Sequence, residues 1–331
     1  MINTKILTFT RFIAAFWVVL FHFFANTKLV NFNFPLIEII LNNGNLAVIY
    51  FFILSGFILT HVELLNFQSN WSFFLKKRFF RLYPIYFVAL LMSSLLLNSP
   101  PTLLSLITNI LCLQVFIPNW NTINSPSWSI GQEFIFYLLF PLLFKYSKSK
   151  IISYTLLITL SVFGLIDFIF FHTYFQNSLP QYFWIISSFI FGIYLRKMLN
   201  IQWVFNALNK YHAPLFLIAI TSFFLFISFF QFNFFYGNIF INISFGILIL
   251  SLTMVKKESL ANKLFSSKLA VFLGEISYAI YIFQVPIYFL STYFYIHRPR
   301  LQFAIFIVLL FFLSSMATKF IERPFIAYSK K

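Results

Sequence analysis

The stretch RFIAAFWVVLFH, residues 11–22, indicates the fold class, because it opens an apolar run that contains no acidic residue, glycine or proline. The run continues to about residue 27 and approaches the roughly 20 residues that a helix needs to cross about 30 Å of hydrocarbon. Arg11 and His22 are eleven positions apart, roughly three helical turns, so they lie on nearly the same helix face about 16 Å apart. The stretch therefore predicts a membrane helix that carries two polar groups on one face.

Similar apolar runs recur along the whole chain, and the composition agrees with them. Of the 331 residues, 61% are hydrophobic and only 9% are charged, and the mean hydropathy is +0.89. A soluble protein carries about 25% charged residues. The runs are continuously apolar rather than alternating, which argues against an outer-membrane barrel.

We therefore predict an all-α, polytopic integral membrane protein with about ten transmembrane helices. They are expected near residues 11–27, 45–63, 82–98, 129–145, 151–170, 181–195, 213–230, 236–254, 272–291 and 301–320.

An eleventh apolar stretch, from Thr102 to Ile117, is expected to be re-entrant or to lie at the outer surface. This interpretation places most basic residues on the cytoplasmic side, as the positive-inside rule requires, and it accounts for the net charge of +16 without nucleic acid. We expect both termini in the cytoplasm, a location in the cytoplasmic (inner) membrane, and a single domain over 1–331 with no appended soluble domain. A single cysteine, Cys112, excludes an intrachain disulfide and a multi-cysteine metal site.

Two ionisable residues are expected at one depth, although more than a hundred residues separate them in sequence. His22 lies near the outer end of the first span, and Glu133 lies about one turn inside the outer end of the fourth. A carboxylate bonded to one imidazole nitrogen raises the basicity of the other, as a general base requires. Ser129 precedes Glu133 by four residues and shares its helix face. The alternative is that these polar groups only tie two helices together.

A basic segment, WSFFLKKRFFRLYP at residues 71–84, precedes the third predicted span. Arg78 and Arg81 are three residues apart, so on a helix their guanidinium groups converge, with Lys77 one turn from Arg81. Convergent arginines suit bidentate phosphate binding. An ordinary positive-inside loop, or one that contacts lipid head groups, is the alternative interpretation.

Two further spans carry small or polar residues inside apolar sequence. Ser55 and Gly56 lie mid-span, where small residues allow close helix approach. Ser277, Tyr281 and Gln284 follow an i, i+4, i+7 pattern and share one helix face. Such a polar stripe suggests a cavity wall, although the tyrosines could equally be packed core residues.

Together these stretches resemble the acyltransferase-3 family of membrane acyltransferases. The resemblance rests on Arg11 and His22 with ten residues between them, FFILSGF at 51–57, RFFRLYP at 78–84, SWSIGQEFIFYLLFP at 127–141, GEISYAIYIFQVP at 274–286 and IERPF at 321–325. These motifs occur in order over nearly the whole chain, and the series is more specific than any single motif. Members of this family move an acyl group, usually acetyl from acetyl-CoA, onto a glycan or lipid-linked hydroxyl.

The resemblance implies His22 as the catalytic histidine, Arg11 as its partner on the same helix, and Arg78 with Arg81 as the donor-binding pair. It also implies a role for Glu133. The family often has glutamate where this chain has Gln132, and histidine where it has Gln284.

We expect an O-acetyltransferase that uses acetyl-CoA as co-substrate, holds no bound cofactor or metal, and acts on an envelope polysaccharide or lipid-linked sugar. Glycan-assembly proteins and membrane lipid are expected partners. His22 would act as general base or as acyl-carrying nucleophile. Ser55, Ser129, Tyr281 and Gln284 are candidate acceptor or oxyanion contacts. The alternative function is a transporter or flippase of a lipid-linked saccharide, since buried polar residues mark such pathways too.

Overall fold

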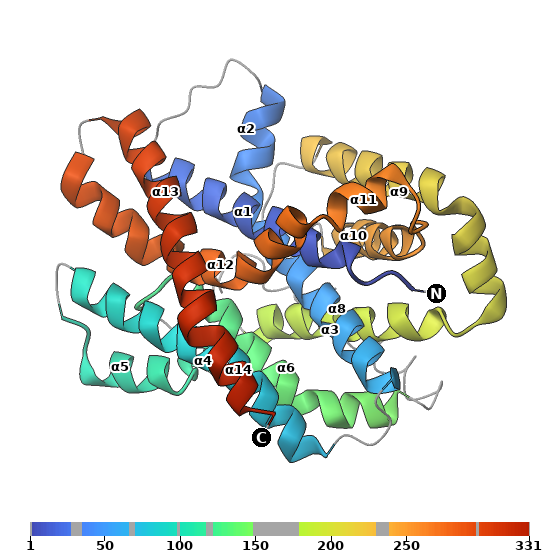
Figure 1. The fold of residues 1–331 in the computed structure, drawn as a ribbon, viewed down its shortest axis with the longest axis horizontal. Helices are drawn as coiled ribbons and strands as arrows, with labels where there is room; N and C mark the ends of the chain where they lie inside the picture. Colours follow the sequence, from blue (N-terminus) through green and yellow to red (C-terminus); the bar gives the residue numbers. More distant parts are fainter. Residues whose placement is uncertain are drawn as a thin grey trace. The chain divides into compact units, whose positions relative to one another are not determined.

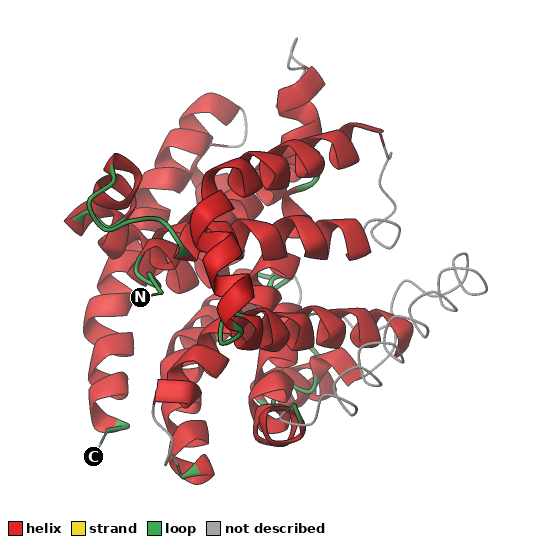
Figure 2. Cartoon of the chain, turned by 90° about the vertical axis from the view of Figure 1, so that its right-hand side faces the viewer, coloured by secondary structure: helices red, strands yellow, loops and turns green. Residues whose placement is uncertain are grey.

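The computed structural model describes residues 2–27, 35–65, 70–97, 100–116, 122–147, 179–229, 238–295 and 298–330, and these residues form helices without strands (Figure 2). Seven of the helices in these ranges are long and apolar enough to cross a membrane. The chain is thus an all-α polytopic membrane protein. The predicted span at 151–170 lies outside the described residues, and each of the other nine coincides with a helix.

The helices, labelled in Figure 1, have the following bounds: α1 Ile6–Thr27, α2 Pro35–Asn42, α3 Ala47–Leu65, α4 Trp71–Leu96, α5 Leu103–Ile110, α6 Ser127–Tyr146, α8 Leu179–Met198, α9 Gln202–Phe229, α10 Asn238–Thr253, α11 Leu260–Phe265, α12 Lys268–Tyr295, α13 Pro299–Ala317 and α14 Arg323–Tyr328. Short 3₁₀ segments, Gly44–Leu46 and Gln114–Phe116, and a π-helical turn, Thr318–Glu322, complete the described chain.

The contacts divide the chain into two compact units. The first unit takes its described residues from Met1–Ala14, Phe32–Gln68 and Leu139–Gly274, and the second from Ala15–Asn31, Ser69–Leu138 and Glu275–Lys331. Helices α1, α6 and α12 each contribute one part to each unit. The expectation of one domain over the whole chain stays a prediction.

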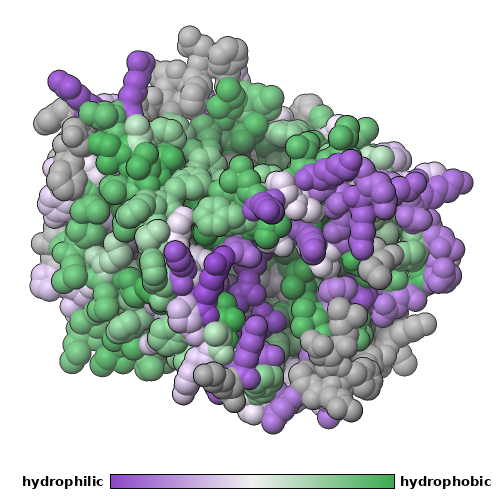
Figure 3. All heavy atoms as spheres, in the orientation of Figure 1, coloured by the Kyte–Doolittle hydropathy of each residue, from purple (hydrophilic) through white to green (hydrophobic). Residues whose placement is uncertain are grey.

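The first unit is built on close packing between α3 and α8. A Cβ added at Gly56 would lie 2.0 Å from the carbonyl oxygen of Phe189, and one added at Gly192 would lie 2.0 Å from that of Ile53. Only glycine permits this approach of two backbones, which confirms the packing role predicted for the small residues of α3. Hydrophilic side chains gather over α11 and the segment before it, where Lys256, Lys257, Glu258 and Lys263 are exposed (Figure 3).

In the second unit, aromatic side chains pack the second half of α1 against α12 and α13. The ring centroid of Phe23 lies 5.8 Å from that of Tyr288 and 5.0 Å from that of Phe306. Beside this core, α14 packs against α4 (Figure 1), and Phe80 stacks on Phe325 with centroids 5.9 Å apart. The core therefore fixes α1 and α12 side by side.

Helix α5 shows why the stretch from Thr102 to Ile117 does not cross the membrane as one helix. It has eight residues and ends at Ile110, so it covers only about 12 Å. Its last carbonyls accept hydrogen bonds from two α4 tyrosines: Tyr83 bonds Ile110 at 3.0 Å, and Tyr86 bonds Asn109 at 2.5 Å. Its opposite face exposes Leu103, Leu104 and Ile107, and the surface there is apolar (Figure 3). This confirms that the stretch is not a full span.

The basic segment at residues 71–84 is helical rather than a loop. Helix α4 begins at Trp71, eleven residues before the predicted start of the span, and Asn70 caps it by accepting from the Ser72 backbone N–H. Polar residues in the first turns end the hydropathy signal without ending the helix, so α4 extends beyond the predicted span at its beginning.

Candidate active site

His22 is held by α12 rather than by α6. It lies five residues before the end of α1 and is half-buried. Its Nδ1 lies 3.0 Å from Oε1 of Gln284, and the Gln284 Nε2 donates to the carbonyl oxygen of Tyr281 at 2.7 Å. The expectation that Glu133 orients the His22 ring is therefore corrected, because the ring nitrogen that was assigned to a carboxylate bonds to an amide.

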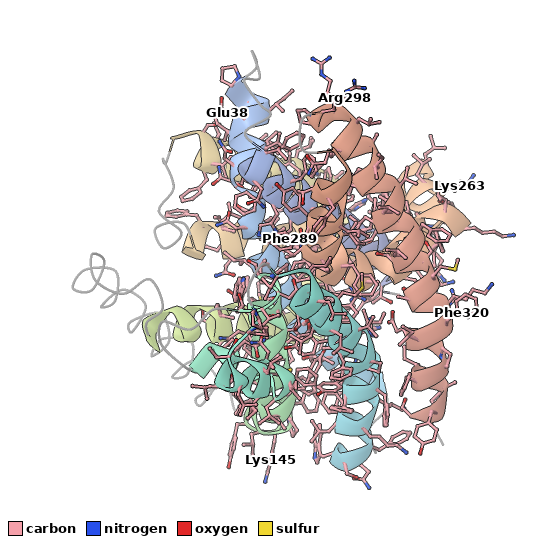
Figure 4. All side chains as sticks on the ribbon, turned by 90° about the vertical axis from the view of Figure 1, so that its left-hand side faces the viewer. Glu38, Lys145, Lys263, Phe289, Arg298 and Phe320 are labelled. Atoms are coloured by element: carbon pink, nitrogen blue, oxygen red, sulfur yellow. The ribbon has the colours of Figure 1, made fainter. Side chains whose placement is uncertain are left out.

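A cavity of about 240 Å³ adjoins this pair. Its walls come from α1, α12 and α13 and from the turn before α6, and they comprise Val19, His22, Phe23, Asn26, Ser125, Gln284, Val285, Tyr288, Phe289 and Phe306. Phe289 extends from α12 (Figure 4). The volume lies below the roughly 300–1,000 Å³ that holds a drug-sized ligand, so the cavity fits one ring or one acyl end rather than a whole nucleotide cofactor. Of the predicted polar stripe of α12, Gln284 lines this cavity, whereas Ser277 and Tyr281 are not among its lining residues.

The start of α6 is fastened to α12 by a second set of polar bonds. The hydroxyl groups of Ser129 and Tyr281 lie 2.8 Å apart, and the carbonyl oxygen of Pro126 lies 3.0 Å from the first and 3.4 Å from the second. One hydroxyl can therefore donate to the other, which in turn donates to this carbonyl oxygen. Ser129 therefore does not hold Glu133 in place, as its spacing had suggested. Both hydroxyl groups are buried, so these bonds fix the rotation of α6 relative to α12.

Asn124, which the sequence analysis missed, supports the same helix. Its Nδ2 donates to the carbonyl oxygen of Ile282 at 2.9 Å. That carbonyl lies four residues before Pro286, which has no N–H to bond it, so the helix leaves it free at this point. A proline inside a predicted span was the available signal, because it requires a donor from elsewhere.

Further along α6, Glu133 belongs to an arginine cluster. Tyr137, one turn after Glu133, donates a hydrogen bond to its carboxylate. The guanidinium carbon of Arg78 lies 5.7 Å from the ring centroid of Tyr137 and 5.3 Å from that of Phe74. Glu133 and Arg81 both lie within electrostatic range of Arg78. The structure thus places Glu133 with the predicted donor-binding residues.

Arg78 and Lys77 differ in their surroundings. The Nε of Arg78 is buried and has no hydrogen-bond partner among the described residues. A buried donor without a partner costs about 1–3 kcal/mol, so this group suits an anionic ligand. Arg81 is half-buried, whereas Lys77 is exposed and lies 3.9 Å from the ring centroid of Phe73. Arg78 and Arg81 therefore lie near each other, whereas Lys77 lies on an exposed face of α4.

Two predicted residues belong to the first unit. Arg11 lies in α1 and within electrostatic range of Tyr50, whose hydroxyl lies 2.5 Å from Oγ1 of Thr10. The structure confirms that Arg11 and His22 share one helix. Ser55 is half-buried in α3 beside the glycine packing.

A second buried cluster in the first unit was also not predicted. Arg196 of α8 is 6% exposed, and its Nε donates to Nδ1 of His61 at 2.9 Å. Its Nη1 donates to Asn200 at 3.0 Å. The acceptors are a ring nitrogen and an amide oxygen rather than a carboxylate. We therefore interpret the cluster as a structural contact between α3 and the end of α8.

The second unit thus contains the His22 imidazole beside a small cavity, the pair Arg78 and Arg81, and a line of polar side chains on α12 and α6. We call this line, Gln284, Tyr281, Ser129, Glu133 and Tyr137, the polar file. A membrane helix bundle with a base of this kind and a phosphate-binding pair has the parts of a group-transfer enzyme.

Comparison with known proteins agrees with this class. The chain belongs to the acyltransferase-3 family, since the family model, an acyltransferase domain, matches residues 5–319. No solved structure matches the chain.

Individual relatives cover the chain to different extents. The chain is 34% identical over 113 residues to the acyltransferase MdmB of Streptomyces mycarofaciens, which covers 31% of the chain and 29% of that protein. It is 25% identical to the O-acetyltransferase OatA of Staphylococcus aureus, over 86% of the chain and 53% of that protein. The peptidoglycan O-acetyltransferase OatA of Listeria monocytogenes is also 25% identical, over 85% of the chain and 51% of its own length. The chain thus spans about half the length of these two longer relatives.

Proposed function

We propose that this chain transfers an acetyl group from acetyl-CoA to a hydroxyl group of an envelope polysaccharide or lipid-linked sugar, in the cytoplasmic membrane with both termini in the cytoplasm. The family membership supports acyl transfer, and the names of the OatA relatives support acetyl as the group and a cell-wall glycan as the acceptor class. The observation that carries the proposal is the pairing of a cavity at His22 with the buried, unpartnered Nε of Arg78 in one unit.

The donor would bind through its phosphates at Arg78 and Arg81. Guanidinium groups bind phosphate oxygens by charge-assisted bonds, each worth about 1.5–3 kcal/mol. The flanking rings of Phe74 and Tyr137 hold the Arg78 side chain in place. Glu133 lies within electrostatic range and orients the guanidinium before the donor arrives. In this arrangement Glu133 acts as a positioning residue for the donor site.

Transfer takes place at His22. The imidazole removes the proton of the acceptor hydroxyl while the hydroxyl oxygen forms a bond to the thioester carbonyl carbon. The carbon–sulfur bond then breaks. The proton passes from the imidazolium to the CoA sulfur. In the covalent alternative, the imidazole nitrogen bonds to the thioester carbonyl carbon and the carbon–sulfur bond breaks, which releases CoA as the thiolate. The acceptor hydroxyl oxygen then bonds to the acetyl carbon as the carbon–nitrogen bond breaks, and the hydroxyl proton passes to the CoA thiolate. Both routes need a neutral imidazole.

Isothermal titration calorimetry of the purified chain in detergent with acetyl-CoA tests the donor site. We expect saturable binding by the wild type and a loss of affinity of at least tenfold in the double variant Arg78→Ala/Arg81→Ala. Lys210→Ala, which removes an exposed lysine of α9 in the first unit, is the matched control and should bind as the wild type does. A folded wild-type chain that binds no acetyl-CoA at about millimolar concentration would contradict the proposal and favour a saccharide transporter.

A further inference from the structure

The side-chain amide of Gln284 is fixed by two bonds of opposite kind. Its Nε2 donates to the carbonyl oxygen of Tyr281 at 2.7 Å, and its Oε1 lies 3.0 Å from Nδ1 of His22. Gln284 is only 2% exposed, so its amide has little contact with bulk water. The amide is therefore held in one orientation at the wall of the cavity.

This orientation decides which nitrogen of His22 carries the proton. A carbonyl oxygen only accepts, so the Gln284 amide must turn its Nε2 toward Tyr281 and its Oε1 toward the ring. An amide oxygen also only accepts, so Nδ1 of His22 must be the N–H donor. In a neutral imidazole the lone pair then resides on Nε2.

We infer that Gln284 is a positioning residue that keeps His22 in its Nδ1–H form and leaves Nε2 as the nitrogen that acts on substrate. The inference rests on the proposed function for its catalytic meaning, but the protonation pattern itself is a property of the resting protein. It also explains how a histidine can be oriented in this chain without a carboxylate at its Nδ1.

The choice of an amide has a physical consequence. A carboxylate at the same place would accept from Nδ1 but would also stabilise the imidazolium, whereas an amide orients the ring without added charge. Tyr288 is the other titratable side chain that lines the cavity, and its remaining walls are apolar or carry neutral polar groups. The surroundings therefore keep His22 neutral and ready to accept a proton.

Nitrogen-15 NMR of the histidine-labelled chain tests the protonation pattern directly, with the His22 signals identified by their loss in His22→Ala. We expect wild-type His22 to show a protonated Nδ1 and an unprotonated Nε2 at neutral pH. In Gln284→Leu, which removes the acceptor, we expect the proton to distribute over both nitrogens. A wild-type ring with its proton on Nε2, or an unchanged pattern in Gln284→Leu, would overturn the inference whether or not the chain transfers acetyl groups.

Kinetics test the positioning role separately. Gln284→Leu should lower kcat about 10- to 100-fold, less than the 10²–10⁴-fold that a general base itself contributes, and should change KM for acetyl-CoA less than twofold. Gln284→Glu should move the acidic limb of the pH–rate profile upward by about one pH unit, because the carboxylate stabilises the imidazolium. Gln284→His keeps an acceptor nitrogen and should recover part of the lost rate.

Asn242→Leu is the matched control, since it removes another buried amide, on α10 in the first unit. This variant should keep the wild-type rate and pH profile. If Gln284→Leu folds, binds acetyl-CoA and keeps the wild-type kcat and pH profile, the positioning role is wrong. If the wild-type chain transfers no acetyl group but its NMR pattern is as expected, the proposed function is wrong and the assignment of the proton to Nδ1 of His22 stands.

Discussion

Two helix pairs, one in each unit, meet by different means. In the first unit, α3 and α8 meet backbone to backbone at Gly56 and Gly192, where an added Cβ would lie only 2.0 Å from a carbonyl oxygen. In the second unit, α6 and α12 meet through buried hydroxyl and amide groups, with Ser129 and Tyr281 2.8 Å apart.

This difference indicates that the contact between α3 and α8 is structural, whereas the contact between α6 and α12 belongs to the candidate active site. Packing of small residues is insensitive to charge and tolerates no added volume, whereas a bonded polar group can take part in chemistry but leaves an unsatisfied partner when it is removed. We therefore expect substitutions in the first unit to change stability and those in the polar file to change activity as well.

Gly56→Ala should give the largest loss of stability. The added methyl group meets the backbone of Phe189, so the two helices must separate, and we expect the free energy of unfolding to fall by about 3 kcal/mol. The melting temperature in detergent and the folded yield measure this loss. Transfer activity per folded molecule should remain at the wild-type value.

Gly246→Ala sharpens the same test. Its added Cβ meets the ring of Phe191, with the nearest atom 2.6 Å away at the end of a side chain that can turn aside. The expected loss is about 1 kcal/mol or less. Equal melting temperatures for the two variants would show that the backbone contact at Gly56 does not govern the packing of this unit.

Asn124→Ala should have the next largest effect, in the second unit. It leaves the buried Ile282 carbonyl without a donor beside Pro286, which costs about 2 kcal/mol. Because α12 also carries Gln284, we expect the transfer rate to fall along with the melting temperature. Asn206→Ala on α9 should change neither quantity. A loss of stability with full activity would contradict the dependence of the site on the bond between Asn124 and Ile282.

Tyr281→Phe should cost less, since it removes one hydroxyl and leaves the ring in place. The loss of its bond to Ser129 is expected to lower the free energy of unfolding by about 1 kcal/mol. Calorimetry should show weaker acetyl-CoA binding, because α6 carries Glu133 and Tyr137 beside Arg78. Unchanged binding in this variant would show that the bond between Ser129 and Tyr281 does not influence the donor site. Tyr211→Phe, at an exposed tyrosine of α9, is the control.

The smallest effect concerns Cys112, which lies just after α5 and is 7% exposed. Burial raises the pKa of its thiol to about 12. The thiolate is the reactive form, so at about pH 8 roughly one thiol in ten thousand is ionised. Maleimide should label the native chain far more slowly than the denatured chain. Equal labelling rates would show that the bonds from Tyr83 and Tyr86 to α5 do not keep Cys112 buried.

Hydropathy was sufficient to predict the long helices of the described residues but not their ends, and it did not predict the short helices α2, α11 and α14. Nine predicted spans coincide with helices, because crossing hydrocarbon requires long apolar runs. Helix α4 begins eleven residues before the predicted span, since hydropathy marks the apolar core of a helix and not its first turns. Four of the polar residues described above, His22, Glu133, Arg78 and Arg81, could be singled out from the sequence, because ionisable residues in apolar runs are rare. Asn124 and Tyr137 are not ionised at neutral pH and were missed.

The partner of each polar residue was not predictable. Depth placed His22 and Glu133 at one level, but contact also depends on how far each helix is rotated about its axis. That rotation is set by bonds between distant segments, such as Ser129 with Tyr281 and Asn124 with Ile282. Sequence spacing within one helix carries no information on these bonds, so Gln284 could not be distinguished from Glu133 as the partner of His22.

The O-acetyl content of the cell envelope tests the assignment of His22 most directly, because it does not require the acceptor to be known. Alkali-labile acetate is measured in cells that lack their own copy and carry either the wild-type chain or His22→Ala, at equal levels in the membrane. We predict that the wild type restores the acetate and that His22→Ala leaves it at background, since a general base contributes about 10²–10⁴-fold to the rate. Equal acetate in the two strains would contradict His22 as the catalytic residue.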